Sequence, residues 1–528
     1  MLKKKYSLIT VAVATFAAGC SFQPKYERPG APVAATFPSS GVYAPKPVPA
    51  PDTLPKGLPA EPATQPLSAR SANGQAAADI GWRDFFADPR LQRIIEIALA
   101  NNRDLRVSML NVAQARAQYQ ITRAELFPTL NATGEDSVQR TPKDLSFFNR
   151  TVSRTYQVGL SSSWELDFWG RIRSLKDQAL QQYFATAEAR KAAEISLVSQ
   201  VADQYVTMLA DDDLLQVTED TLKTARASYE LTKLQFENGT GSELDLRQAE
   251  SVVEQANANL QAQARARAQA ENALVLLLGQ PLPDDLPPGR KLDDQALLAD
   301  IPAGLPSDLL TRRPDIMEAE ASLRAANANI GAARAAFFPK ITLTGSFGTA
   351  SPTLGGLFKP GSAAWTFAPQ ISLPIFEGGQ NVANLDLAHI QKNIQVANYE
   401  KAIQSAFRDV ADGLAARSTY DQQIDALERN TFAEQRTLDL STLRYRNGVD
   451  SYLQVLTAQT NLYSAQQSLI NARMARLTTL VNLYVALGGG WLQHAGEAPR
   501  APDDGTDYRT MSGLQGGASS VKAAAAPG

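Results

Sequence analysis

The residue types that most often carry chemistry are scarce in this chain of 528 residues. It contains two histidines, His389 and His494, and a single cysteine, Cys20. No glycine-rich phosphate loop, serine nucleophile elbow or zinc-type spacing is present. His389 falls within a predicted long helix, where a surface or seam position is the simpler interpretation. The six methionines form no cluster suited to a soft metal. We therefore predict a protein that is not an enzyme and uses no cofactor or metal.

Cys20 is the one side chain whose surroundings predict a covalent reaction. A basic start (Lys3–Lys5) and an apolar run precede it, which is the pattern of a secretory signal removed from the mature chain. Ala17–Cys20 resembles the lipobox of bacterial lipoproteins, with Ala17 where leucine is usual. A single cysteine cannot form a disulfide within the chain, so lipidation is the favoured interpretation. Ser21, rather than aspartate, follows it, and by resemblance to lipoprotein sorting this indicates the outer membrane.

A short turn occurs twice in the chain. Its residues are Asn238, Gly239 and Ser242 in the first copy and Asn447, Gly448 and Ser451 in the second. A glycine just past a helix end takes the left-handed conformation, and a serine soon after it caps the next helix. Ser451–Gln454 has the spacing of a capping box, and Ser242–Asp245 is a looser acidic version. Each copy therefore predicts the tip of a helical hairpin.

The duplication extends well beyond the turns. An offset of 209 relates Gly239 to Gly448 and still holds at Gly279 and Gly488, while Phe127 pairs with Phe338 at 211. A repeat this long predicts one structural unit made twice. The predicted organisation is a signal peptide at 1–19, a lipidated Pro/Ala-rich segment at 20–80, a first repeat at 81–285, an inter-repeat linker at 286–306, a second repeat at 307–495 and a disordered tail at 496–528.

Each repeat predicts the same order of elements. A first helix is expected at 87–126 and 307–337, because a Phe-Pro pair then ends it. Period-two alternation predicts long strands at 156–168 and 365–375, with hairpin partners beginning near Thr129 and Lys340 and polar loops at 135–154 and 350–364. Apolar residues spaced three and four apart predict coiled-coil helices at 171–236 and 380–446, with return helices at 242–279 and 451–487.

The strands offer a route through a membrane that the helices lack. After the signal, no segment has the roughly 18 continuous apolar residues of a spanning helix. One chain supplies only four alternating strands, whereas a closed barrel takes about eight or more. Two copies give eight strands and three give twelve, so an oligomer is predicted. Loss of the three signal lysines takes the net charge from −3 to −6, and no basic stretch suggests nucleic acid.

Seven motifs lie in order within this duplicated frame. They are Pro24–Pro29, Trp82–Phe85, Leu166–Arg171, Leu309–Ile316, Leu373–Gly379, Tyr445–Asp450 and Val455–Gln459. Together they resemble TolC-like outer-membrane efflux factors, in particular OprM/NodT-type lipoproteins, from Cys20 to about Leu492. The resemblance implies an α+β, TolC-like homotrimer: a twelve-stranded barrel in the outer membrane of a Gram-negative bacterium, above a long periplasmic α-barrel. It also implies a periplasmic adaptor and an inner-membrane pump, most often of the RND type, exporting drugs, solvents or metals.

The same resemblance implies a gate where six hairpin tips from three chains converge. The positions that match it are Tyr445, Arg446 and Asp450, which latch the coils by polar bonds, and Leu453, which forms the apolar constriction. Many relatives carry pore-facing carboxylates where this chain has Gln454 and Thr457. Asp245, in the first hairpin, and Asp450 are the candidates to replace them.

Two alternatives remain. A structural coiled-coil stalk on the cell surface would explain the heptads and the secretion signal, although not the alternating strands or the tip turns. Within the class of conduits, a protein-secretion outlet is the second possibility, and the lipidation site and the motifs favour small-molecule efflux over it.

Overall fold

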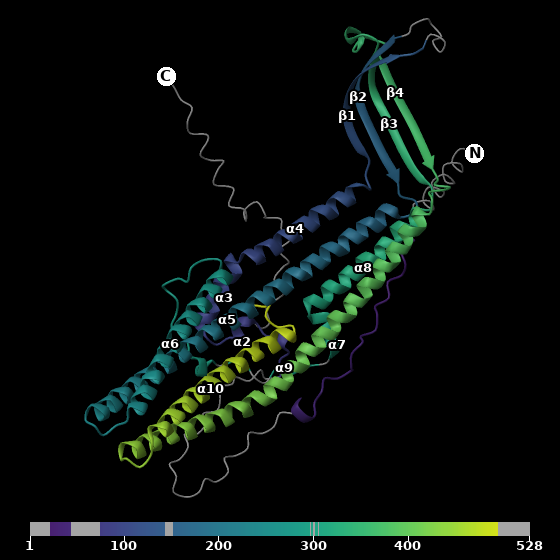
Figure 1. Cartoon of the computed structure of the whole chain (residues 1–528). Helices are drawn as coiled ribbons and strands as arrows, with labels where there is room; N and C mark the ends of the chain where they lie inside the picture. Colours follow the sequence, from purple (N-terminus) through teal and green to yellow (C-terminus); the bar gives the residue numbers. More distant parts are fainter. Residues whose placement is uncertain are drawn as a thin grey trace, which may run out of the picture.

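The computed structural model of the chain describes residues 22–43, 74–142, 152–295, 297–298, 301–304 and 306–494. Its architecture is elongated, with a four-stranded sheet at one end and two helical hairpin tips at the other (Figure 1). Cys20 and the tail at 496–528 lie outside the described residues. None of the described helices has the length and apolar character needed to cross a membrane.

The sheet combines the strands of both repeats. β1 (Thr129–Arg140), β2 (Val152–Leu166), β3 (Lys340–Ser351) and β4 (Ala363–Ser372) are antiparallel and lie in chain order. The two predicted hairpins are present, and β2 also pairs with β3 across the repeats. The loop predicted at 135–154 was too long, because residues 135–140, mostly polar, continue β1 and residues 152–154 begin β2. The backbone groups of residues 135–140 are paired with those of residues 152–157 in β2.

The single first helix predicted in each repeat was wrong, because each is two helices. They are α3 (Pro89–Asn101) and α4 (Arg103–Ala124) in the first repeat, and α7 (Pro306–Arg312) and α8 (Pro314–Ala335) in the second. Asn102 interrupts the first pair and caps α4, since its side-chain oxygen accepts from the amide of Leu105 at 2.9 Å. Pro314 interrupts the second pair, since it has no amide proton to continue the ladder of α7. A short helix, α2 (Trp82–Phe85), precedes α3.

The long helices are confirmed. α5 (Arg171–Glu237) and α9 (Gln380–Arg446) each contain 67 residues. At 1.5 Å per residue each reaches about 100 Å. The return helices are α6 (Glu243–Leu278) and α10 (Tyr452–Ala486). α4 and α8 also have equal lengths of 22 residues, so the repeat predicted from the offsets is a repeat of structure.

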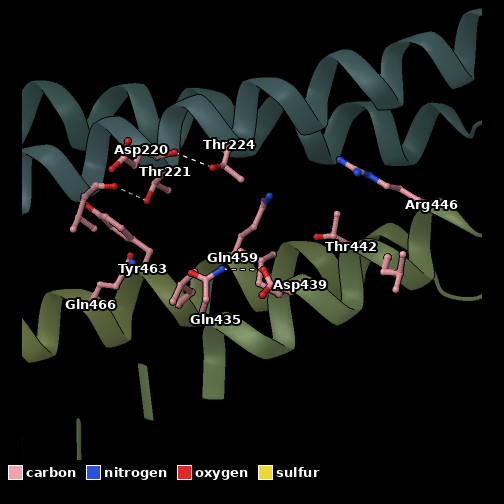
Figure 2. Close-up of a pocket in the computed structure, with 14 residues that line it drawn as sticks. Asp220, Thr221, Thr224, Gln435, Asp439, Thr442, Arg446, Gln459, Tyr463 and Gln466 are labelled. Carbon is pink, nitrogen blue, oxygen red and sulfur yellow. Dashed lines mark hydrogen bonds between the residues drawn. The ribbon is translucent and has the colours of Figure 1, made fainter. Parts of the chain in front are cut away.

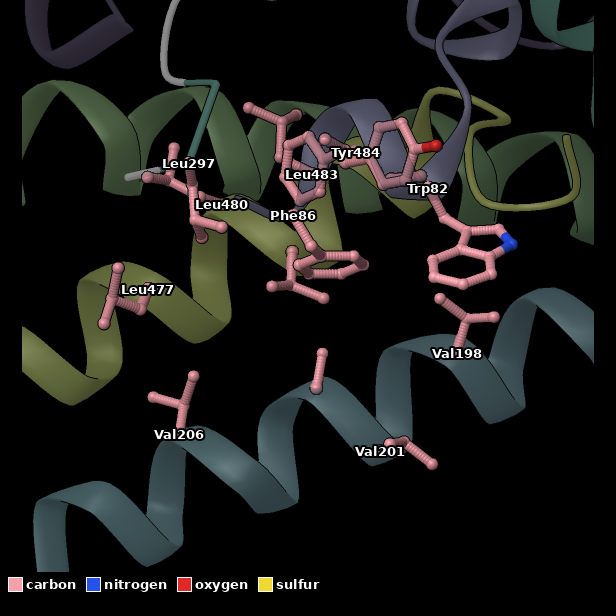
Figure 3. Packing of buried hydrophobic residues seen from close by; sticks show 14 of the residues in the cluster. Trp82, Phe86, Val198, Val201, Val206, Leu297, Leu477, Leu480, Leu483 and Tyr484 are labelled. Carbon is pink, nitrogen blue, oxygen red and sulfur yellow. The ribbon is translucent and has the colours of Figure 1, made fainter. Parts of the chain in front are cut away.

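The main core lies near the middle of the molecule, where α2 packs between α5 and α10 (Figure 3). Phe85 stacks on Tyr484 with ring centroids 4.1 Å apart, and the Tyr484 hydroxyl donates to the carbonyl of Ile80 at 2.6 Å. Val198 and Val201 of α5 complete the layer. This core joins the two repeats, so the hairpins project from a common base.

A buried carboxylate holds the inter-repeat linker against this base. Asp88 is 1% exposed and accepts hydrogen bonds from Tyr205 at 2.9 Å, from Gln295 at 2.8 Å and from the amide of Arg290 at 3.0 Å. These donors satisfy a charged group that would otherwise be costly to bury. The linker is therefore fixed to α3 and α5 by one side chain.

The N-terminal segment 22–43 runs along α8 and α9 from the base of the sheet (Figure 1). Asn327, fully buried in α8, donates to the carbonyl of Pro24 at 2.8 Å, and Arg28 binds Glu320 at 2.7 Å. A Cβ at Gly331 would lie 2.9 Å from the Cα of Gln23. The absence of a side chain there lets the segment lie directly on α8.

Candidate gate at the hairpin tips

The first tip has the predicted turn. Gly239 has φ +73°, in the left-handed region, and Asn238 donates its side-chain amide to the carbonyl of Leu234 at 2.7 Å. Ser242 caps α6, since its hydroxyl accepts from the amides of Leu244 at 3.0 Å and Asp245 at 3.3 Å. Two otherwise unpaired amides of the first turn are thus satisfied.

The second tip reaches the same backbone shape with different side chains. Gly448 has φ +71°, and Asn447 donates to the carbonyl of Leu443 at 2.7 Å. The capping box predicted at Ser451 is wrong, because its side chain makes no capping hydrogen bond. The guanidinium of Arg444 instead holds both carboxylate oxygens of Asp450, at 2.5 and 3.0 Å. A charged pair therefore closes this turn.

Asp450 and Arg446, expected to act together, have separate surroundings within one chain. The hydrogen bond from Arg444 is the main cause that lowers the pKa of Asp450 below its ordinary value, and Arg444's charge adds to it. Asp450 therefore stays ionised at neutral pH. Arg446 lines a groove between the two hairpins (Figure 2). A bond of Asp450 or Arg446 to a second chain remains a prediction.

Tyr445 does link the two hairpins. Its hydroxyl donates to the side-chain oxygen of Gln235 on α5 at 2.7 Å. Its ring lies 5.4 Å from the ring of Tyr452, which is 1% exposed in a small apolar cluster at the tip. Burial is the main cause that raises the pKa of Tyr452 to about 12. Sequence reasoning missed Gln235 and Tyr452. The one available signal was a tyrosine at a first-turn position where the other repeat has Glu243.

Leu453 lies on the opposite face of α10. It is 51% exposed, and Gln454 and Thr457 are exposed beside it, whereas Tyr452 and Val455 are buried. Positions 453, 454 and 457 share one helix face because residues three and four apart are neighbours. Asp245 is half-buried, and its charge contributes to the raised pKa of Tyr452. The structure therefore places Asp245 near the contact between the two hairpins and Leu453 on the solvent-exposed face of α10.

The groove between the hairpins has a volume of about 560 Å³. It is lined by Val217, Asp220, Thr221, Thr224, Gln435, Leu438, Asp439, Thr442, Leu443, Arg446, Gln459, Leu462, Tyr463 and Gln466. Figure 2 shows Arg446 reaching from the second hairpin toward the first, with Asp220 and Thr224 on the facing helix. Polar side chains dominate it, so the lower part of the hairpin contact is open to water.

Comparison with known proteins places these features in a family. The family model described as "Outer membrane efflux protein" matches residues 94–280 and 305–489. The toluene efflux pump outer membrane protein TtgC and the antibiotic efflux pump outer membrane protein ArpC, both of Pseudomonas putida, are each 48% identical over 496 residues, covering 93% of this chain and 97% of theirs. The crystal structure of the open state of the Neisseria gonorrhoeae MtrE outer membrane channel is 41% identical, with a TM-score of 0.76 over 90% of this chain and 100% of that one.

The two family matches coincide with the two structural repeats, each of which contains a strand pair and a long helical hairpin. The sequence identity extends over nearly the whole length of the relatives. The chain therefore belongs to the outer membrane efflux protein family: it is a non-enzymatic outer-membrane channel of an efflux pump, with the TolC-like fold.

Proposed function

We propose that three copies of this chain form the exit duct of a tripartite efflux system, which conducts small toxic compounds passively out of the cell. The observation that carries the trimer is the open sheet. β1 and β4 are its outer strands, and among the described residues neither has a partner on its outer side. Unpaired edges are strongly disfavoured in a membrane. Pairing of β4 with β1 of the next chain satisfies both, and three chains give twelve strands.

The helices support the same arrangement. In the helical layer, the two outer helices are α4, which leads into β1, and α9, which comes after β4. α5 and α8 pack between them. Both outer helices expose apolar side chains: Val107, Leu110 and Ile121 on α4, and Val382, Leu387, Ile390 and Ile394 on α9. Exposed apolar stripes at both edges of one layer are the surfaces that a ring of identical chains buries.

The proposed cargo comprises organic solvents and antibiotics, because TtgC and ArpC are named for toluene and antibiotic efflux pumps. The proposed partners are a periplasmic adaptor and an inner-membrane pump of the RND type. We also propose the repeat bounds 81–285 and 307–495, supported by the equal lengths of α5 and α9.

A lipid anchor at Cys20 is a further part of the proposal. Phe22, two residues beyond it, stacks on Phe338 at 4.5 Å, and Phe338 stacks on Trp169 at 4.8 Å. Trp169 follows the end of β2 and Phe338 precedes β3, so the first described residue after Cys20 lies at the base of the sheet, which supports the proposed anchor. Metabolic labelling with a fatty-acid probe tests the anchor: the wild type should be labelled and Cys20→Ser should not. Equal labelling of both contradicts this assignment.

Two measurements test the trimeric duct. Light scattering of the detergent-extracted protein should give the mass of three chains, and a stable monomer would contradict the shared sheet. In a deletion strain, the wild-type gene should restore resistance to solvents and antibiotics. Normal assembly without any restored resistance, while a known efflux channel restores it, would contradict the export function.

A further inference from the structure

The sheet presents one apolar face and one polar face. In β2 the even-numbered residues from 156 to 166 are mostly apolar, whereas every odd-numbered residue from 153 to 165 is polar or glycine. In β3 the residues opposite Leu160 and Trp164 are Phe347 and Leu343, so the apolar face continues across the sheet. In the proposed duct the apolar face contacts lipid and the polar face lines the pore.

Aromatic residues mark two levels on the apolar face. Trp164 lies near the helical end of the sheet, where its indole donates to the carbonyl of Leu126 at 3.0 Å. Tyr156 lies eight residues nearer the opposite end, which is about 26 Å along a strand and about 20 Å along the membrane normal at a tilt of about 40°. Val158 and Leu160, between them, are 43% and 48% exposed. Because aromatic girdles border the apolar band of outer-membrane barrels, Tyr156 marks the outer boundary of that band.

An ion pair lies on the same face just beyond Tyr156. The guanidinium of Arg154 binds both carboxylate oxygens of Asp136, at 2.9 and 2.5 Å. Its carbon lies over the Tyr156 ring, 4.7 Å from the centroid. A charged side chain on the lipid-facing surface is costly at the bilayer midplane and much less so near the interface. The pair, about 5 Å beyond Tyr156, therefore lies at the level of the lipid head groups.

Arg140 adds an unpaired charge beside this ion pair. It is opposite Val152 at the end of the β1–β2 register, and therefore on the same face as Arg154. Its side chain is exposed, and among the described residues it has no ion-pair partner. Asp136 binds Nε and Nη2 of Arg154, and no described residue accepts from Nη1. The outer-rim patch, as we call Asp136, Arg140, Arg154 and Tyr156, thus has a formal charge of +1 and free guanidinium donors.

We propose that the outer-rim patch binds the phosphate-bearing head group of a lipid in the outer leaflet of the outer membrane. This site rests on the duct proposed above, in which the end of the sheet farthest from the hairpin tips faces outward (Figure 1). A guanidinium presents its donors in a fork that matches phosphate oxygens. The acyl chains of a lipid held there would cover Val158 and Leu160, whereas dissolved phosphate would leave them exposed. The apolar surface below the patch therefore favours a lipid over dissolved phosphate.

Thermal unfolding of the full-length, detergent-solubilised protein measures this binding. The lipid is titrated in detergent, and the rise of the unfolding midpoint gives an apparent Kd. The probe is lipid A that carries both phosphates, compared with the same lipid after its phosphates are removed. The phosphorylated form should bind the wild type about tenfold more tightly. Inorganic phosphate at the same concentrations should leave the midpoint unchanged.

Substitutions in the patch should change the affinity in opposite directions. Arg140→Gln with Arg154→Gln should weaken the binding of phosphorylated lipid A about tenfold, because both guanidinium groups are lost. Arg140→Gln alone should weaken it about threefold, and it removes no ion pair between the strands. Asp136→Asn should strengthen it about threefold, because a carboxylate that repels phosphate is gone. The matched control is Arg265→Gln, at an exposed position of α6 far from the sheet, which should bind as the wild type does.

Four results would overturn the proposal. They are equal binding of the two forms of lipid A by the wild type, unchanged affinity in the double Gln variant, weaker binding by Asp136→Asn, and a midpoint rise with inorganic phosphate as large as that with phosphorylated lipid A. The gain expected for Asp136→Asn is the sharpest of these tests, because a damaged strand pair cannot produce tighter binding.

The resistance test described above separates failure of the patch from failure of the duct. A wild type that restores resistance in the deletion strain but binds both forms of lipid A equally would overturn the patch and leave the duct intact. Phosphate-dependent binding by a protein that restores no resistance would contradict the duct and support the patch.

Discussion

The two hairpin tips share one backbone and differ in what stabilises it. Both turn at a left-handed glycine, Gly239 or Gly448, and both carry an asparagine that binds the preceding turn. The first tip is capped by Ser242, whereas the second is closed by Arg444 and Asp450. Duplication therefore kept the path of the chain while the stabilising side chains changed. The change leaves Ser451 without a capping role.

The upper ends of the hairpins show the same contrast. Asn102, at the start of α4, donates to the carbonyl of Leu277 at 2.8 Å, and Arg313, at the start of α8, donates to the carbonyl of Ala486 at 3.1 Å. These positions are related by the repeat offsets of 211 and 209. Each side chain ties a return helix to the break between the first two helices. Arg313 also pairs with Asp315 at 2.6 Å and with Asp409 of α9 at 3.6 Å, so the second repeat uses charge where the first uses an amide.

The largest expected difference between the repeats is at these upper ends. Arg313→Ala should lower stability by about 3 kcal/mol, because it removes a largely buried guanidinium that donates to the carbonyl of Ala486 and pairs with Asp315 and Asp409. Asn102→Ala should cost about 1–2 kcal/mol, for one cap and one further hydrogen bond. The thermal midpoint of the detergent-solubilised protein measures both. Equal losses of stability in the two variants would show that Asn102 and Arg313 hold their return helices equally strongly.

The next effect concerns the gate, most of whose predicted residues lie at the second tip. Asp450→Ala with Leu453→Ala should leave assembly unchanged and raise single-channel conductance several-fold, because it removes the turn's charged pair and the exposed leucine. Vancomycin should then enter cells. The control is Leu244→Ala, at the equivalent position of the first tip and 66% exposed. Normal assembly with wild-type conductance in the double variant would place the gate elsewhere.

A smaller difference is expected at the two serines. Ser242→Ala should destabilise the first turn of α6 by about 1 kcal/mol, because two amides lose their acceptor. Ser451→Ala should have almost no effect on α10, since that hydroxyl caps nothing. Hydrogen exchange of residues 243–246 and 452–455 reports each turn separately. A similar loss of protection at both sites would show that Ser451 does cap its helix.

The smallest effect is a dependence on pH confined to the second tip. Arg444 lowers the pKa of Asp450 from 3.8, so the stabilisation of this turn is complete above that value and disappears as the pH falls through the lower, folded value. Between pH 7 and pH 5 the exchange of residues 443–452, corrected for intrinsic rates, should stay constant, and protection should fall only below about pH 4. Asp450→Asn and the first tip should show no such step. A transition near pH 6 would contradict the pairing with Arg444.

Periodicity and turn chemistry were enough to predict the long elements. Period-two alternation located the strands, and the three–four spacing of apolar residues located α5 and α9 almost to the residue. Pro314 indicates a helix break in the sequence, and the prediction of a single helix at 307–337 did not take it into account. Asn102 carried a weaker signal, since asparagine is common both in caps and on helix surfaces. The ends of α5 and α9 were predicted closely because left-handed glycines lie beside them, at Gly170, Gly239, Gly379 and Gly448.

The partners of side chains between the hairpins were not predictable in the same way. Gln235 and Tyr445 are 210 positions apart, and which face of α5 meets the second hairpin depends on how both coils leave the common base. Arg444 was available as a partner for Asp450, only six residues away, but the family resemblance directed attention to Arg446. Local spacing predicts helices and turns, whereas contacts between hairpins require the packed structure.

The position of the N-terminal segment has a consequence for the order of folding. Pro24 binds Asn327, 303 residues further along the chain, and Gly331 leaves room for Gln23. Residues 22–28 are made and exported early, yet the surface that receives them does not exist until α8 has formed. Contacts between such distant positions form slowly, because a long loop must close first. The first segment after the predicted signal peptide is therefore among the last to reach its place, because it must wait for α8 of the second repeat.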